Sequence, residues 1–248
     1  MSDFPRRPDD ATDTRRMKAI LVAVAAIAFA TVPFAVPFDG FDPALYPEPQ
    51  IDPPVQPAGY AFGIWGPIYL WLLAHALFGL VRRADDTVWD RTRWPLLVSL
   101  IIGAAWLPAA QVSPLAATAM IYVMLASALL ALFRTPPEAD RWLLRAPLAL
   151  YAGWLTAAAW VAWGLVGAGY GVALDEIGWA WVALAAALGM ALLVIRGLGQ
   201  APFYAAAVVW ALVAVAVSNW GALWGLVGLA LVGAVAVAGF AAYRMRAL

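Results

Sequence analysis

The sequence predicts an all-α polytopic membrane protein with about eight transmembrane helices. Of its 248 residues, 65% are hydrophobic and 12% are charged, about half the charged fraction of an average soluble domain. The mean hydropathy is +0.82, and several apolar runs approach or exceed the roughly 20 residues that a helix needs to cross a bilayer. This composition excludes a soluble globular domain.

The apolar runs give the expected helices. The first six cover residues 19–36, 60–81, 95–110, 115–133, 147–166 and 177–195. The remaining stretch, 201–243, is too long for one crossing, so we divide it at its only polar break, 218–221. The result is eight crossings.

The placement of basic residues supports this count. Every lysine and arginine lies in a terminal tail or in an alternate connection, namely 82–93, 134–145 and 196. The intervening loops, 37–57, 111–114, 167–176 and 218–221, contain none of the 15 basic residues. By the positive-inside rule we expect a multi-pass protein of the bacterial inner membrane with both termini in the cytoplasm.

The N-terminal segment 1–17 is polar and mixed in charge, and we expect it to be a disordered cytoplasmic tail. The first apolar run then begins after Lys18. An alternative is a cleaved signal peptide, because Ala28-Phe29-Ala30 has the small-x-small pattern of a cleavage site. The long acidic n-region and the apolar residues beyond that site favour a transmembrane helix.

Several function classes are disfavoured by what the sequence lacks. No cysteine is present, so thiol chemistry and cysteine metal sites are excluded. The formal net charge of zero argues neither for nor against a nucleic-acid partner, but the membrane class argues against one. No acidic or basic residue lies inside a predicted span, which argues against a coupled pump and against paired-carboxylate catalysis. We expect no catalytic residues and no metal ligands; an enzyme would have to act through His75 or tryptophan photochemistry.

The 14 tryptophans are the most informative residues. Five of them are expected near the external surface: Trp65, Trp106, Trp163, Trp179 and Trp181. One interpretation is the aromatic belt at the membrane interface. The other is an aromatic wall for a flat apolar ligand, because ligand pockets are mostly apolar with few polar groups.

Two further features allow alternatives. His75 is the only histidine. It is either a structural residue bonded to a neighbouring helix or a functional one, which would ligate a haem-like iron or donate a hydrogen bond to a bound polar group. The loop 37–57, rich in proline and acidic residues, is either a solvated connector or a lid over the external pocket.

The run Tyr60-Ala61-Phe62-Gly63-Ile64-Trp65-Gly66-Pro67-Ile68-Tyr69 resembles the signature of the TspO/MBR family, in its long form called tryptophan-rich sensory proteins. Three other stretches fit this resemblance: Trp106-x-Pro108, the Tyr151-x-Gly153-Trp154 block, and Phe203-Tyr204 followed by Trp210.

The resemblance implies a five-helix core over 18–168 and a three-helix C-terminal extension over 169–248. It also implies a pocket for porphyrins, sterols or other apolar ligands. Motif positions linked to that pocket are occupied by Tyr60, Phe62, Trp65, Tyr69, Trp106 and Pro108, to which we add His75 and Trp163 as candidates. Compact members carry an asparagine where this chain has Gly103. The resemblance therefore supports the fold of the family more strongly than its ligand.

Two functional hypotheses follow. The first is binding of a flat hydrophobic ligand, tetrapyrrole- or isoprenoid-like, for sensing, sequestration or transfer, with haem or porphyrin as the candidate cofactor. The second is a structural or assembly subunit that packs against membrane partners or pigments, as a homodimer or within a larger complex. In both, membrane lipid surrounds the chain.

Overall fold

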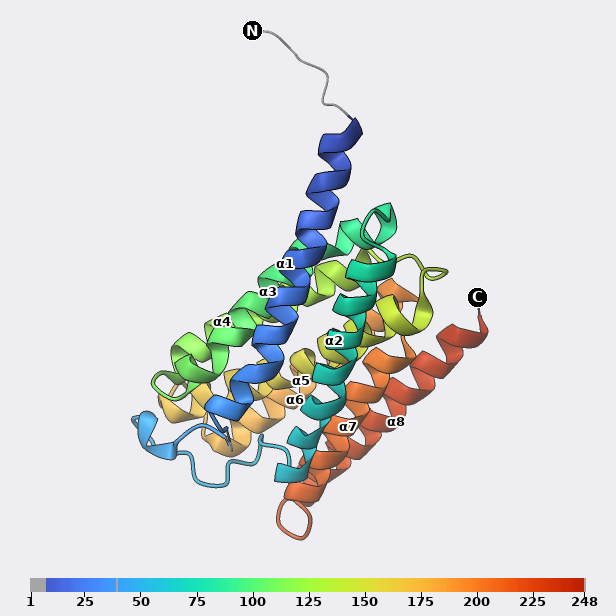
Figure 1. The fold of residues 1–248 in the computed structure, drawn as a ribbon. Coiled ribbons are helices and arrows are strands. Elements are labelled where there is room, and N and C mark those ends of the chain that lie inside the picture. Colours follow the sequence, from blue (N-terminus) through green and yellow to red (C-terminus); the bar gives the residue numbers. More distant parts are fainter. Residues whose placement is uncertain (1–7, 39, 248) are drawn as a thin grey trace, which may run out of the picture.

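The computed structural model describes residues 8–38 and 40–247, and these form a bundle of eight α-helices without strands (Figure 1). The helices are α1 (Pro8–Ala35), α2 (Trp65–Arg82), α3 (Thr87–Ala110), α4 (Pro114–Phe133), α5 (Ala146–Gly169), α6 (Glu176–Leu198), α7 (Pro202–Ser218) and α8 (Trp224–Arg246). Short helical turns precede α2 and α5, namely η2 (Gly59–Ile64) and the π-helical η3 (Arg141–Arg145), and η1 (Pro43–Leu45) lies in the first loop.

The predicted fold class and helix order are confirmed. Seven helices of the described chain are long and apolar enough to cross a membrane, and α7 is a shorter apolar helix of 17 residues. The division of the last apolar stretch is also confirmed, because α7 ends at Ser218 and α8 begins at Trp224. Gly221, in the turn between them, has a φ of +86°, which favours glycine.

The expectation of a disordered tail over 1–17 is wrong for residues 8–17, which form the first turns of α1; residues 1–7 lie outside the described part of the chain. Polar contacts to the α2–α3 connection and to the first turn of α3 explain the longer helix. Arg16 pairs with Asp85 at 2.9 Å, and Lys18 pairs with Asp90 at 2.9 Å. Isolated helical ends fray, whereas these contacts give this one tertiary support.

Helix α5 is the centre of the bundle. It packs against α2, α4, α6 and α7, and most of its side chains are buried. A continuous hydrophobic cluster joins residues of α1–α5 to residues of α6, α7 and α8. The expected boundary between the five-helix core and the C-terminal extension therefore runs through a shared hydrophobic core.

The contact between α5 and α7 is close because of Gly153. A Cβ atom at this position would collide with the backbone carbonyl oxygen of Tyr204 and would lie 2.9 Å from the Cβ of Ala207. One turn along α5, the Thr156 hydroxyl donates to Ala152 O, so the buried Tyr204 hydroxyl donates to Thr156 Oγ1 at 2.8 Å. A small residue and a satisfied polar pair thus hold the extension on the core.

Charged groups collect at the end of the bundle where α1 starts. The buried Arg145 guanidinium donates to the carbonyl oxygens of Thr135, Leu198 and Gln200 at 2.7–3.1 Å. Nearby, the Arg83 guanidinium and the Trp89 indole N–H both bond Asp140 and hold the pKa of that carboxyl below its usual range. We call the end of the bundle that carries these groups the basic end.

We expect Gly153→Ala to destabilise the protein by about 1–3 kcal/mol, because its added methyl group must push α7 away from α5. Thermal unfolding in detergent measures the effect. Gly189→Ala is the control, since a Cβ on this α6 glycine meets nothing within 4 Å. Equal melting temperatures for the two variants would contradict the close α5–α7 contact.

Candidate functional site

The loop between α1 and η2 covers the end of the bundle opposite the basic end (Figure 1). Backbone hydrogen bonds join Glu48 N to Gly169 O at 2.9 Å and Ala58 N to Ala214 O at 3.1 Å. The buried Asn219 side chain donates to Pro54 O at 2.8 Å. The loop is therefore attached to the ends of α5 and α7, so the extension takes part in positioning it.

Aromatic side chains on this loop turn towards the helices. Phe38 and Phe41 contact Trp106 edge-on, with ring centroids 5.0 and 6.0 Å apart. Tyr46 is buried at the C-terminal end of α5, and burial raises the pKa of its hydroxyl above the usual range. The loop therefore packs on the helices as a roof over this end of the bundle, whereas a solvated connector would leave its aromatic side chains exposed.

Beneath the loop, the start of α2 presents the motif aromatics. Trp65 and Tyr69 are four residues apart, so they share a helix face and stack with centroids 5.2 Å apart. Phe29 of α1 meets both rings edge-on, and Trp154 of α5 meets Trp65 edge-on at 6.1 Å. Such edge-to-face contacts make a rigid aromatic wall.

Gly103 of α3 makes room for Phe29 in this wall. A Cβ atom at Gly103 would lie 2.6 Å from Phe29 Cε2 and 3.1 Å from the terminal carbon of Met124. The apolar ring of Phe29 thus occupies the space into which any side chain at Gly103 would project. This explains in packing terms why the position is a glycine.

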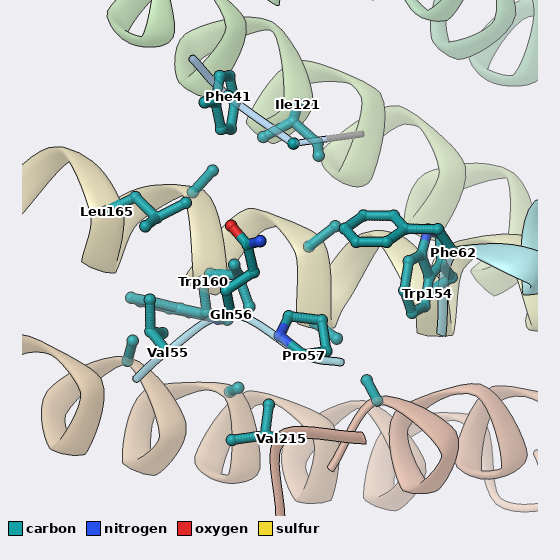
Figure 2. A pocket seen from close by; sticks show the side chains of 18 of the residues that line it. Phe41, Val55, Gln56, Pro57, Phe62, Ile121, Trp154, Trp160, Leu165 and Val215 are labelled. Carbon is teal, nitrogen blue, oxygen red and sulfur yellow. The ribbon is translucent and has the colours of Figure 1, made fainter. Parts of the chain in front are cut away.

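Two cavities lie among these residues. The first, of about 220 Å³, is enclosed by helices α1–α5 and is lined by Phe29, Trp65, Tyr69 and Met124 among others. The second, of about 70 Å³, lies between α5, α6 and α7 under the loop (Figure 2). They share a wall made of Phe38, Phe62, Trp106, Ile121, Trp154 and Ala158.

No charged residue among the described ones lines either cavity. The polar exceptions are the Tyr69 hydroxyl, the tryptophan N–H groups and the Gln56 amide, which projects among the apolar side chains in Figure 2. An apolar lining with a few polar groups is the usual character of a small-molecule site.

Half of the sequence-predicted site residues meet at these cavities. Phe62 and Trp106 line both of them, and Trp65 and Tyr69 line the first. The structure places the other four elsewhere: Tyr60 is half exposed against Trp210, Pro108 is exposed on α3, Trp163 packs edge-on against Tyr122, and His75 lies towards the basic end.

His75 of α2 is buried against η3 and the start of α3. Its Nδ1 donates to Leu143 O at 2.7 Å, and its ring stacks on Trp89 with centroids 4.8 Å apart. It lines neither cavity. These contacts match the first of the two interpretations of His75, a histidine bonded to a neighbouring segment.

Sequence reasoning missed several lining residues. Phe29 lies in an apolar run where nothing distinguishes it, and Gln56 lies in an irregular loop whose path the sequence does not predict. Trp154 could have been found from the Tyr-x-Gly-Trp block. Its expected position deep in the membrane set it apart from the tryptophans near the external surface, among which the candidates were sought.

Four of the motif residues thus line a cavity inside a helical membrane bundle. One family model matches residues 17–243 under the description TSPO-like protein. The chain belongs to the TSPO-like family. Searches of curated proteins and of solved structures gave no match. The match covers helices α6–α8 as well as α1–α5, so the extension is part of the TSPO-like sequence pattern.

We expect Asn219→Ala to loosen the loop of this TSPO-like chain while the helices stay intact. The change leaves Pro54 O without its donor, at a cost of about 1–3 kcal/mol, whereas Val215 O keeps the backbone N–H of residue 219. Hydrogen exchange at the Gln56 and Ala58 amides should become faster. Ser218→Ala, an exposed neighbour, is the control; unchanged exchange in Asn219→Ala would contradict the tether.

We expect His75→Phe to lower the melting temperature and to leave ligand binding unchanged. Phenylalanine keeps the stacking on Trp89 but leaves the Leu143 carbonyl without its donor, a loss of about 1–3 kcal/mol. Thermal unfolding and a haem titration monitored by the Soret absorption measure the two effects. A weakened or spectrally altered haem complex would instead support His75 as an iron ligand.

Proposed function

We propose that this TSPO-like chain binds a hydrophobic small molecule, tetrapyrrole- or isoprenoid-like, at the two adjoining cavities. It would hold this molecule for sensing, sequestration or transfer. The observation that carries the proposal is the uncharged, apolar lining, rich in aromatic rings, that helices α1–α7 and the covering loop contribute. Aromatic rings offer large apolar area with little flexibility, which suits recognition of flat or extended apolar molecules.

Binding requires the roof to move. Both cavities are smaller than the roughly 300–1,000 Å³ of typical ligand pockets. The loop side chains Phe38 and Phe41 are partly buried and contact the helices through ring edges. Displacing them enlarges the cavities without unfolding a helix, so the loop serves as a lid in this proposal.

The proposed orientation puts the basic end in the cytoplasm of a bacterium. The opposite end, which the loop between α1 and η2 covers and which we call the roofed end, lies on the external side of the inner membrane. The support for this orientation is the absence of lysine and arginine from the loops 37–57, 111–114, 167–176 and 218–221. Ligand would then enter from the external side or from the surrounding lipid.

A structural role is the second candidate. The outward face of α8 carries Gly228 and Gly239, where an added Cβ would meet nothing within 4 Å, so another helix could approach closely. A second copy of the chain or a partner membrane protein would occupy this face. Copurification of a stable complex in mild detergent would favour this role.

Titration of the purified protein in detergent with protoporphyrin IX, haem and all-trans-retinol, read by tryptophan quenching, tests the binding proposal. We expect saturable quenching by at least one probe and an apparent affinity at least tenfold weaker in Trp65→Leu, which removes a wall of the first cavity. The matched control is Trp224→Leu, an exposed tryptophan outside both cavities.

Quenching that rises linearly with each probe and is equal in both variants would mean nonspecific partitioning. The ligand-binding proposal would then fail, and the structural role would become the leading one.

A further inference from the structure

We infer that the ligand is a neutral, elongated isoprenoid-type molecule that extends from the first cavity into the second and carries one hydrogen-bond-accepting oxygen. This inference rests on the proposed binding function and specifies its ligand. Three independent features of the two cavities support it: their charge, their shape and their unpaired donors.

The charge of the site argues against acidic ligands. No lysine or arginine occurs in any loop at the roofed end, and the described basic residues from Arg15 to Arg246 bond groups at the opposite end or lie beside it. The roof instead carries Asp42, Glu48 and Asp52. A carboxylate without a cation is costly to bury, so the two propionates of a porphyrin would lack partners here.

The shape of the site favours a chain over a disc. The second cavity reaches sideways from the first to Ala187 of α6 and Ala211 of α7. At the shared wall, the Phe62 and Trp154 rings meet edge-on at 6.1 Å with an interplanar angle of 84°. A wide planar ring cannot pass this pair, whereas a narrow chain needs only a rotation of Phe62, which is half-buried on η2.

The unpaired donors indicate an oxygen on the ligand. Trp154 is 2% exposed, and its indole N–H has no acceptor among the described residues. By contrast, the N–H groups of Trp106 and Trp210 donate to Ala117 O and Ala61 O. Buried donors are normally satisfied, and a ligand carbonyl or hydroxyl in the shared wall would satisfy this one.

Gln56 supplies a second polar group, in the lining of the second cavity. Its amide belongs to the loop, lines the second cavity, and makes no side-chain hydrogen bond among the described residues (Figure 2). In the proposed complex, the ligand oxygen lies on the second-cavity side of the shared wall and bonds the Trp154 N–H of α5 and this amide of the lid. Ligand binding would then favour the closed position of the loop.

Four probes test the inference, three of which share one polyene: all-trans-retinol, all-trans-retinoic acid, and axerophtene, the same polyene without the oxygen. The fourth is protoporphyrin IX. In detergent at neutral pH, we expect saturable quenching by retinol and an apparent affinity at least tenfold weaker for retinoic acid. Retinoic acid or protoporphyrin IX binding tighter than retinol would overturn the neutral-ligand inference and leave the binding function standing.

Variants test the donors and the second cavity. Trp154→Phe and Gln56→Leu should each weaken retinol binding about fivefold, a typical contribution of one hydrogen bond, and leave axerophtene binding unchanged. Trp154→Phe changes the packing of the helix core, whereas Gln56→Leu changes only a loop side chain. Agreement between the two variants therefore shows that the loss does not come from a packing defect. Equal losses for retinol and axerophtene, or no loss in either variant, would overturn the assignment of the oxygen.

Ala187→Leu fills the second cavity, and Ala185→Leu places the same side chain on the exposed face of α6. We expect at least a tenfold loss of retinol affinity only in Ala187→Leu. Equal affinities would overturn the two-cavity arrangement. Absence of saturable quenching with all four probes would instead reject the proposed binding function itself.

Discussion

The structure depends on the close packing of α5 in the middle of the bundle. Helices α2, α4, α6 and α7 pack against α5, and the α7 contact requires Gly153, because any side chain there would meet the backbone of Tyr204. Between lipid-exposed helices there is little hydrophobic driving force, so close contact and satisfied polar pairs supply the specificity. Since α5 also carries Trp154, the helix that holds core and extension together forms part of the wall between the cavities.

The loop illustrates how the extension changes a TSPO-like bundle. Its hydrogen-bond partners include Ala214 and Asn219, which belong to α7 and its C-terminal end. The second cavity likewise exists because α6 and α7 lie beside α5. The C-terminal helices thus hold the roof and add apolar space, and we regard them as part of the site.

The two ends of the bundle have separate physical tasks. At the basic end, charged and aromatic groups bond one another and backbone carbonyls, as in the Arg83–Asp140–Trp89 and Arg145 clusters. At the roofed end, aromatic rings contact one another and an N–H donor of Trp154 stays unpaired. A satisfied network is suited to holding structure, while an unsatisfied donor in an apolar cavity is suited to a ligand.

The sequence by itself determined the membrane class, eight helices, the break at 218–221 and the aromatic motif, because hydropathy, charge placement and local spacing are properties of contiguous residues. It also predicted Phe62, Trp65, Tyr69 and Trp106 as lining residues. Only the tertiary structure decided that His75 lies away from the cavities, that Phe29 and Gln56 line them, and that α6 and α7 enclose a second space. These depend on which helix faces meet, and contacts between distant segments leave no local pattern.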